Sequence, residues 1–360
     1  MMSRVCRWCV VAMAVCLASC SFEEGNREQM VNLEAVAENP DNQLVNLNEA
    51  IARSGRDGSL YARRAMVLLR KGELEEALKD VDQAISLSKG DPANYFVKAQ
   101  VLYLMGKPKE ALPLALQAER NSYQSSSLYV LLAELYLQRR EFDKANQYIR
   151  KALELSPSDE YAFYYRGRIH AATGDTVKAI RNFRLALEQN SDLMQSHREL
   201  AGLYLAEKDM PQAKKHLKKV GQLDIEEPLY WYYSGLIHQE EQKKDSARLS
   251  FQKAVALSDT LQGAHYELGL LLHAQGDYEG AVQHLNQAEK LYGTSLKYLS
   301  VKASSYERLG ENLPALQHYQ RIVALEPRHT YAQQSVARLK YKLERPRPLL
   351  DSMAVRQQVY

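Results

Sequence analysis

The sequence predicts an all-α protein in which helical hairpins repeat and stack into an α-solenoid. One pattern of apolar and small residues returns every 34 residues, through eight contiguous units from Gly58 to His329. Within each unit, one small residue recurs at a fixed place in the first half and another in the second half. A unit of this length cannot bury its apolar face alone, so neighbouring units must stack and share a continuous core.

The recurring small residues predict where two helices touch. The position in the first half holds only alanine or glycine: Ala65, Ala99, Ala133, Gly167, Ala201, Gly235, Gly269 and Ala303. The position in the second half always holds alanine: Ala77, Ala111, Ala145, Ala179, Ala213, Ala247, Ala281 and Ala315. A fixed small residue lets two helix backbones approach to the lower end of the roughly 8–10 Å range of helix packing.

Residues 1–19 predict a secretory signal peptide. Arg4 and Arg7 precede an uncharged apolar stretch over residues 8–18. At about 1.5 Å per helical residue, this stretch is too short to span a hydrocarbon core of roughly 30 Å. The alternative is an N-terminal core helix, which would need a polar face that the stretch lacks.

Cysteine is confined to this region, at Cys6, Cys9, Cys16 and Cys20. Leu17-Ala18-Ser19-Cys20 resembles the bacterial lipobox, a leucine and two small residues before a cysteine that becomes lipidated. The resemblance implies cleavage before Cys20, acyl chains on Cys20 and a tether over residues 20–41. Three acyl chains exceed the two signals that stable membrane anchoring requires. The alternative is a chance cysteine at an ordinary cleavage site. After cleavage and lipidation no free thiol remains for a disulfide, a metal site or a nucleophile.

The 34-residue unit resembles the tetratricopeptide repeat. The turn and second helix of that repeat are similar to QGDYEGAVQHLNQA, residues 275–288, and to KGELEEALKDVDQA, residues 71–84, in the same register. The resemblance implies a right-handed superhelix whose first helices line a concave groove. It also implies a protein that binds an extended peptide or a partner helix in that groove.

Both ends of the repeat array depart from the full unit. Residues 42–57 predict a degenerate half-repeat, a lone second helix with Ala50 in register, whose partner around residues 27–38 is degenerate at best. Residues 330–345 repeat the first-helix register, with Ala337 at the small position, and predict a capping helix. Residues 346–360 lack periodicity and predict a flexible tail.

No catalytic motif is present in the sequence. It contains no glycine-rich phosphate loop, no G-x-S-x-G elbow and no H-E-x-x-H. The formal net charge of +3 becomes nearly neutral without Arg4 and Arg7, which disfavours nucleic-acid binding. The nine histidines recur at repeat positions, and we interpret them as structural or surface residues. We therefore expect no enzyme activity, cofactor, metal or small-molecule substrate.

The groove positions of the family can be carried over onto this sequence. They hold Phe96, Tyr103, Val130, Tyr161, Tyr164, Arg168, Tyr232 and Tyr266. Aromatic residues at about one per unit could take alternate side chains of an extended ligand, while tyrosine hydroxyls bond its backbone. The alternative is ordinary packing in a chain that has 23 tyrosines.

The combination of features resembles the bacterial outer-membrane lipoproteins with tetratricopeptide repeats. It implies a scaffold, anchored through Cys20, that recruits an envelope protein through its groove. The alternative is a permanent structural subunit of a secretion, pilus, motility or outer-membrane assembly complex. Ser21 favours the outer membrane, because aspartate at this place typically retains lipoproteins in the inner membrane. SFEEG, residues 21–25, faintly resembles a surface-export signal, but it equally suits a solvated tether, and we expect the periplasmic side.

Overall fold

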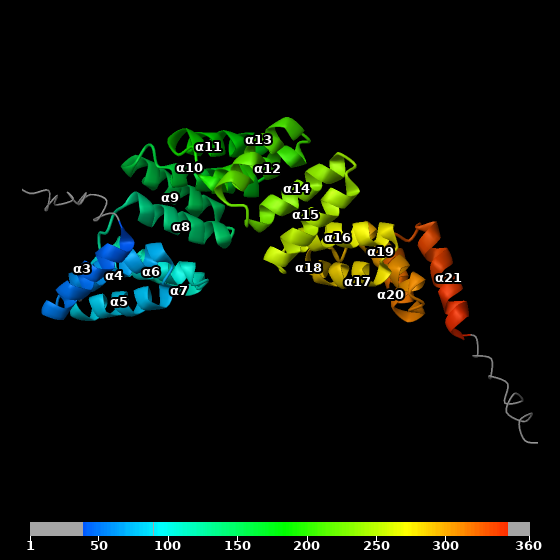
Figure 1. Ribbon diagram of the computed structural model, residues 1–360, viewed down its shortest axis with the longest axis horizontal. Coiled ribbons are helices and arrows are strands. Elements are labelled where there is room, and N and C mark those ends of the chain that lie inside the picture. Colours follow the sequence, from blue (N-terminus) through cyan, green and yellow to red (C-terminus); the bar gives the residue numbers. More distant parts are fainter. Residues whose placement is uncertain (1–38, 89, 345–360) are drawn as a thin grey trace, which may run out of the picture. The chain divides into compact units, whose positions relative to one another are not determined.

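The computed structural model describes residues 39–88 and 90–344. Every regular element in these two ranges is a helix (Figure 1). The helices fall into two compact units that meet between Gln124 and Ser125. The signal peptide, the Cys20 lipidation site, the segment around residues 27–38 and the tail from residue 346 lie outside the described residues.

Unit 1 contains five of the described helices. They are α3 (Pro40–Arg53), α4 (Gly58–Lys71), α5 (Leu74–Leu87), α6 (Pro92–Leu104) and α7 (Pro108–Arg120). The predicted lone helix of the half-repeat is α3, which begins two residues earlier than expected, after its N-cap Asn39. The pairs α4–α5 and α6–α7 form the hairpins of the first two 34-residue units.

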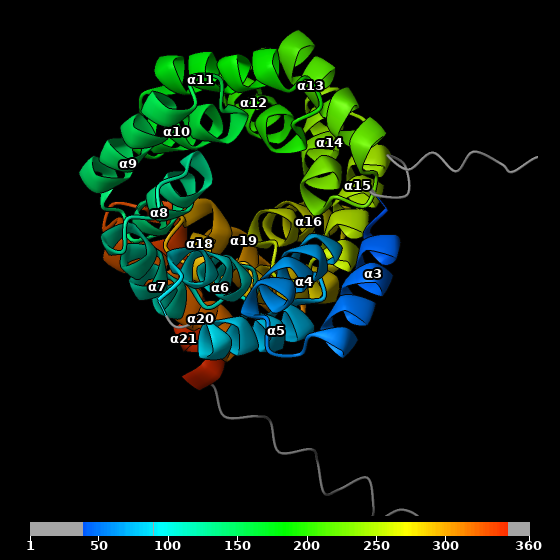
Figure 2. The same cartoon turned by 90° about the vertical axis from the view of Figure 1, so that its left-hand side faces the viewer.

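Unit 2 holds the remaining described helices. They are α8 (Ser126–Gln138), α9 (Phe142–Leu155), α10 (Glu160–Ala172), α11 (Thr176–Gln189), α12 (Met194–Ala206), α13 (Met210–Leu223), α14 (Pro228–Glu240), α15 (Lys244–Leu257), α16 (Gln262–Gln275), α17 (Tyr278–Gln287), α18 (Glu289–Tyr292), α19 (Leu296–Arg308), α20 (Asn312–Leu325) and α21 (Thr330–Glu344). From α8 to α16, the first helices of the hairpins lie on the inner side of an arc and the second helices lie on its outer side (Figure 2). The predicted all-α solenoid is therefore confirmed.

The turn inside each hairpin uses one left-handed residue. Between Gly58 and His329, the residue at the same place in each of the eight turns has a positive φ: Gly72, Gly106, Arg140, Gly174, Lys208, Gln242, Gly276 and Gly310. Glycine adopts this conformation without steric cost, whereas other L-residues are strained there. Arg140, Lys208 and Gln242 therefore occupy a position that suits glycine.

The core of each hairpin matches small residues to large ones. Ala65 and Ala99 on first helices are fully buried, as the fixed small position predicts. Where the second helix carries phenylalanine, the small residue is glycine: a Cβ on Gly167 would lie 2.7 Å from the ring of Phe183. A Cβ on Gly235 would lie 2.4 Å from the ring of Phe251. The side chain of the second helix thus fills the space that the missing methyl leaves.

Two elements differ from the regular pattern. The second helix of the seventh hairpin is interrupted at Ala288, which separates α17 from α18. At the C-terminal end, α21 packs Ala332 and Leu339 against Tyr319 and Ile322 of α20. Ala337, which we expected at a packed small position, is exposed. Its position normally faces the second helix of its own hairpin, and no such helix follows α21 in the described residues.

Candidate functional site

The residues predicted to line the groove all lie on first helices, but in two different units. Phe96 and Tyr103 lie on α6 of unit 1. In unit 2, Val130 lies on α8, Tyr232 on α14 and Tyr266 on α16, and α10 carries Tyr161, Tyr164 and Arg168.

Four of these residues are packed more tightly than a free row of groove side chains would be. Phe96, Val130, Tyr164 and Tyr266 expose 7%, 8%, 4% and 7% of their surface. The ring of Phe96 stacks on Tyr123 at 5.3 Å, and that of Tyr266 stacks on Tyr292 at 4.0 Å. These four side chains therefore pack mainly against the chain's own residues and leave little exposed surface. Tyr161 is 44% exposed, while Tyr103, Arg168 and Tyr232 are half-buried.

An aromatic and charged cluster on α10 links three successive first helices. Arg168 Nη1 lies 3.8 Å from Glu134 Oε1 on α8, and its guanidinium lies 5.9 Å from the centre of the Tyr164 ring. On the other side, the Tyr164 hydroxyl lies 3.5 Å from Glu199 Oε1 on α12. Burial, together with the nearby Glu199 carboxylate, raises the pKa of Tyr164 above its ordinary value. At neutral pH the Tyr164 hydroxyl stays protonated and Arg168 stays charged, so together with the two carboxylates they can hold polar groups of a ligand.

Next to this cluster, a cavity of about 440 Å³ lies between α12 and α14. Its lining residues are Glu199, Gly202, Leu203, Leu205, Ala206, Met210, Tyr232, Tyr233, Leu236, Gln239 and Glu240. We call it the α12–α14 cavity. Of the residues predicted from the sequence, it contains Tyr232. Most of the others are apolar or acidic residues that the single groove position did not indicate.

Glycine residues set the positions of the two tyrosines in the α12–α14 cavity. A Cβ on Gly202 would lie 2.6 Å from the hydroxyl oxygen of Tyr233, so this ring can approach α12 closely only because residue 202 is glycine. Similarly, a Cβ on Gly263 of α16 would lie 2.9 Å from the Tyr232 ring. Burial, followed by the influence of Glu199, raises the pKa of Tyr233 to about 12. Burial also raises the pKa of Tyr232, and Tyr292 and Glu267 add to the effect. Both hydroxyls therefore remain protonated at neutral pH, and that of Tyr232 already donates to Tyr292.

The α12–α14 cavity is acidic. Glu199 and Glu240 belong to its wall, and none of the described residues that line it is lysine or arginine. One of the lining residues, Gln239, donates a hydrogen bond of 3.2 Å from Nε2 to Glu267 Oε2 on α16. Burial raises the pKa of Glu267, because the charged carboxylate is poorly solvated there. A ligand that combines apolar and basic groups would meet complementary chemistry in this cavity.

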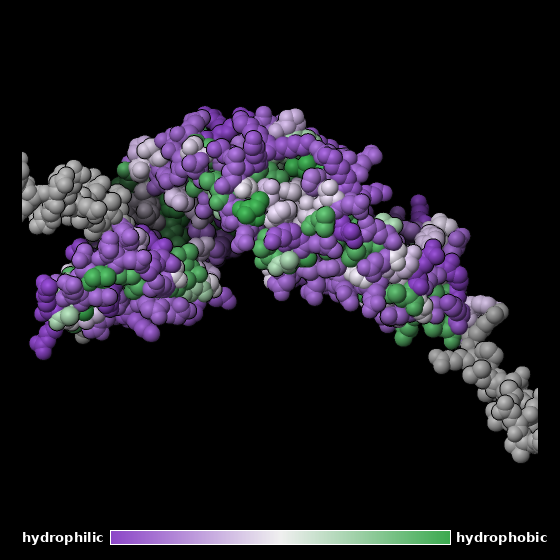
Figure 3. Space-filling view, viewed as in Figure 1, coloured by the Kyte–Doolittle hydropathy of each residue, from purple (hydrophilic) through white to green (hydrophobic). Residues whose placement is uncertain are grey.

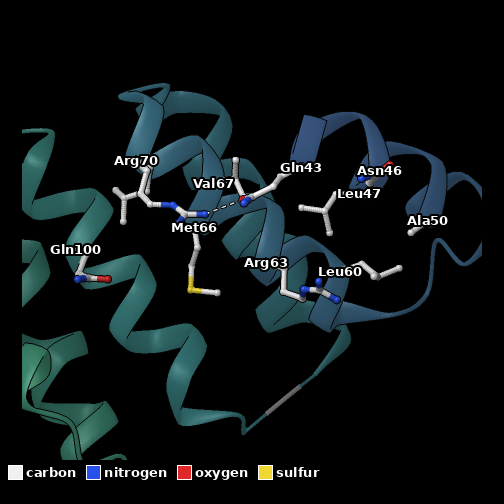
Figure 4. Close-up of a pocket in the computed structure, with 11 residues that line it drawn as sticks. Gln43, Asn46, Leu47, Ala50, Leu60, Arg63, Met66, Val67, Arg70 and Gln100 are labelled. Atoms are coloured by element: carbon white, nitrogen blue, oxygen red, sulfur yellow. Dashed lines mark hydrogen bonds between the residues drawn. The ribbon is translucent and has the colours of Figure 1, made fainter. Parts of the chain in front are cut away.

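A second and larger cavity, of about 700 Å³, lies in unit 1 (Figure 4). It is lined by Gln43, Asn46, Leu47 and Ala50 of α3, by residues of α4, and by Gln100 of α6. Arg70 Nη2 donates a hydrogen bond of 2.9 Å to Gln43 Oε1 across it. Met66 is 44% exposed here. One repeat later, the first helix α4 packs beside α6, whereas the described helix that precedes α4 is the second helix α3. The sequence analysis did not predict this cavity, because the repeat register gives the position of each helix but not the space between neighbouring helices.

Comparison with known proteins gives the nature of the repeat. Models of the tetratricopeptide repeat match residues 58–91, 96–160, 130–193 and 262–295. The chain contains tetratricopeptide repeats. The helical hairpins in the matched regions are therefore tetratricopeptide repeats.

The relatives of this chain are distant and mostly longer. Anaphase-promoting complex subunit 3 of Schizosaccharomyces pombe is 22% identical over 201 residues, which are 56% of this chain and 30% of that protein. A crystal structure of the APC/C hetero-tetramer Cut9-Hcn1 superposes with a TM-score of 0.62 at 16% identity, covering 82% of this chain and 58% of the other. The structure of pilF of Pseudomonas aeruginosa gives a TM-score of 0.53 at 22% identity, covering 59% of this chain and 97% of the other. This chain thus spans about a third of the length of the curated relative and shares a fold with the two structures.

Two further findings concern the described residues. Among their helices, none combines the length and apolar character needed to cross a bilayer. Nor do three or more histidine, cysteine, aspartate or glutamate side chains gather in them as a metal site would require. The tetratricopeptide-repeat fold is typical of non-catalytic scaffolds, and no catalytic family is indicated by the comparisons.

Proposed function

We propose that this protein is a non-catalytic scaffold whose α12–α14 cavity binds a segment of a partner protein. The observation that carries the proposal is the cavity itself, with Tyr232 and Tyr233 held by close glycine contacts beside Glu199 and Glu240. The rings of the two tyrosines supply apolar contact area at a low entropic cost, and their hydroxyl groups can bond a peptide backbone. The carboxylates favour a segment that carries lysine or arginine beside an apolar side chain.

The proposal includes a place in the cell. We propose that Cys20 is lipidated and anchors the chain to the bacterial outer membrane on its periplasmic side. Support comes from the Leu17-Ala18-Ser19-Cys20 motif after a short signal sequence. The partner would then be a protein of the cell envelope.

Photo-crosslinking tests the binding proposal. A photoreactive phenylalanine analogue at Ala206, on the exposed rim of the α12–α14 cavity, should crosslink a defined envelope protein in living cells. The same analogue at Val177, which is 78% exposed on α11, is the matched control and should not. The double substitution Glu199→Gln, Glu240→Gln should reduce the crosslink at Ala206 severalfold while circular dichroism stays unchanged. A partner that crosslinks equally at both positions would refute the cavity as the binding site.

A permanent structural subunit is the second candidate. It is supported by similarity to subunits of the anaphase-promoting complex, which is itself a multi-protein assembly. Exposed apolar side chains on second helices, such as Leu249 and Leu313, also fit it. On the face seen in Figure 3, however, the apolar surface of unit 2 lies in patches separated by hydrophilic side chains. A partner that crosslinks at Val177 and co-purifies in a fixed ratio would favour this candidate.

A further inference from the structure

Two histidine pairs in unit 2 repeat the same geometry. His197 Nδ1 of α12 lies 2.9 Å from His216 Nδ1 of α13. Two repeats later, His265 Nδ1 of α16 lies 2.9 Å from His284 Nδ1 of α17. In each pair, one histidine comes from the first helix of a hairpin and the other from its second helix. The sequence interpretation compared histidines at the same repeat position, which lie in different hairpins, and so missed that two positions meet within one hairpin.

Each first-helix histidine has a second bond that fixes its tautomer. His197 Nε2 lies 3.0 Å from the Ser191 carbonyl oxygen, and His265 Nε2 lies 2.9 Å from the Asp259 carbonyl oxygen. A carbonyl oxygen only accepts hydrogen bonds, so Nε2 of each must carry the hydrogen. Nδ1 of the neutral ring is then an acceptor. His216 and His284 must therefore donate from Nδ1.

This arrangement can take up one proton but not two. When His197 becomes charged, its Nδ1–H donates to His216, whose own hydrogen moves to Nε2, and the Nδ1–Nδ1 hydrogen bond survives. When both rings are charged, two Nδ1–H groups face each other and the bond is lost. The same reasoning applies to His265 and His284, because their contacts are the same.

Burial opposes protonation of His197, His216 and His284. His197, His216 and His265 each expose less than a tenth of their surface. Burial, with the nearby His197, lowers the pKa of His216 to about 4. Burial likewise lowers the pKa of His197 and of His284. An exposed histidine has a pKa of about 6.5, so opening a hairpin lets its pair take up protons.

The charged groups around the pairs come from several elements. Those that act on the first pair are Arg184 of α11, Asp192 before α12, and Lys215 and Lys219 of α13. Lys219 Nζ lies 3.7 Å from Asp192 Oδ1, so these two largely offset each other. The His216 ring stacks on Tyr204, whose hydroxyl accepts a 2.9 Å hydrogen bond from Arg184 Nη2. In the second pair, Asp277 at the N-cap of α17 opposes the effect of burial on His284.

We propose that the two histidine pairs are acid-sensitive latches that hold hairpins α12–α13 and α16–α17 closed at neutral pH and open them as the pH falls. The exposed value lies above the folded pKa values of His197, His216 and His284, so the closed hairpins are stabilised above about pH 6.5 and lose that stabilisation as the pH falls. In hairpin α12–α13 the loss continues towards the His216 pKa of about 4. Each additional proton bound by the open form raises the opening constant about tenfold per pH unit. Because α12 also forms one wall of the α12–α14 cavity, acid would release a segment bound there, a consequence that rests on the proposed function.

Another hairpin of the same chain provides a matched control. In hairpin α8–α9, Tyr129 and Tyr148 occupy the positions that the two histidines occupy in α12–α13, and their rings stack at 6.1 Å. Neither α8 nor α9 contains histidine. The double substitution His197→Tyr, His216→Tyr therefore copies a pair that this chain already accommodates.

Hydrogen exchange between pH 7.5 and pH 5.0, corrected for intrinsic rates, tests the latch without any partner. Protection of α12–α13 and α16–α17 should fall at least tenfold more than protection of α8–α9 in the same molecule. In the double variant, α12–α13 should lose this excess while α16–α17 keeps it. Equal acid sensitivity in all three hairpins would overturn the proposal, as would a folded double variant that behaves like the parent.

A measurement on the unsubstituted protein keeps the test decisive if the variant does not fold. Nitrogen-15 spectra of labelled histidine at pH 7.5 should show His197 protonated at Nε2 and His216 protonated at Nδ1. His216 protonated at Nε2 instead would overturn the latch. A result against the latch in either experiment would not affect the partner-binding proposal, because neither experiment involves a partner.

Discussion

Gly167 and Gly235 stand where a Cβ would collide with a phenylalanine ring of the second helix. Phe183 and Phe251 are fully buried, so their rings cannot swing into solvent to make room. Hairpin α12–α13 uses Ala201 with a smaller partner, Leu217. In these two hairpins, the phenylalanine on the second helix therefore requires glycine on the first helix.

The substitution Gly235→Ala tests this match. Overpacking of a rigid core typically costs about 1–3 kcal/mol, which exceeds the gain of about 1 kcal/mol in helix propensity from replacing glycine. We expect a lower midpoint of urea denaturation for Gly235→Ala. Adding Phe251→Leu, which copies the pair of Ala201 and Leu217, should recover part of the loss. A midpoint that rises in the single variant would show that the ring yields easily.

The sequence positions predicted which side of its helix each residue occupies. They did not predict how closely a neighbouring side chain approaches that residue. Phe96 and Tyr266 lie on first helices as expected, yet Tyr123 and Tyr292 stack on them and remove most of their exposed surface. Tyr123 lies in the turn after α7 and Tyr292 lies at the end of α18, where the periodic pattern carries little information. The tyrosine of the candidate site that could be foreseen was Tyr232, whereas Gly202 and Glu199 beside it could not.

At the scale of the helix, the 34-residue register located the elements closely. First helices begin at Gly58, Pro92 and Ser126, and the later ones continue at the same interval. The register could not show the break at Ala288, because the apolar positions continue through it. Nor could it show that Ala337 is exposed, since that depends on a second helix that does not follow in the described residues.

The left-handed turn position gives a prediction for the hairpins. Lys208 and Gln242 both have φ of 60°, where a non-glycine residue is strained by roughly 1–2 kcal/mol. Lys208→Gly and Gln242→Gly should each raise the free energy of unfolding by up to about 1 kcal/mol, after the added flexibility of the unfolded chain is subtracted. Gly174→Ala is the opposite change at the same turn position, where φ is 83°, and should lower stability. Thermal unfolding of the three variants measures this, and an unchanged or lower midpoint for both glycine variants would contradict it.

At the scale of the whole molecule, the repeat array and the N-terminal segment have different roles in the proposed function. The array provides surfaces such as the α12–α14 cavity, and these depend only on residues that the structure describes. The proposed anchor depends on residues 17–20, which lie outside the described range and remain a prediction from sequence. A scaffold of this kind acts at a membrane only if both parts do what we propose.

The substitution Cys20→Ala tests the anchor. It removes the thiol to which the first acyl chains would be attached, so incorporation of an alkyne fatty acid should be lost and the protein should leave the membrane fraction. Cys16→Ala is the matched control and should change neither, because that residue would leave with the signal peptide. Labelling that persists in Cys20→Ala would mean that the chain is not a lipoprotein at this position.

The matches inside each hairpin also bear on how such a chain can grow. Gly235 fits Phe251, His265 meets His284, and Arg64 bonds Asp80, and in every case both partners belong to one hairpin. Copying a whole hairpin in the gene keeps each match intact. Exchanging a single helix between two hairpins would set a methyl group against a phenylalanine ring, or leave an imidazole without its partner. The smallest part of this protein that carries these three matches with it is therefore the hairpin, not the helix. The contacts of Tyr233 with Gly202 and of Tyr232 with Gly263 join neighbouring hairpins, so a transplanted hairpin must still find a glycine on its neighbour.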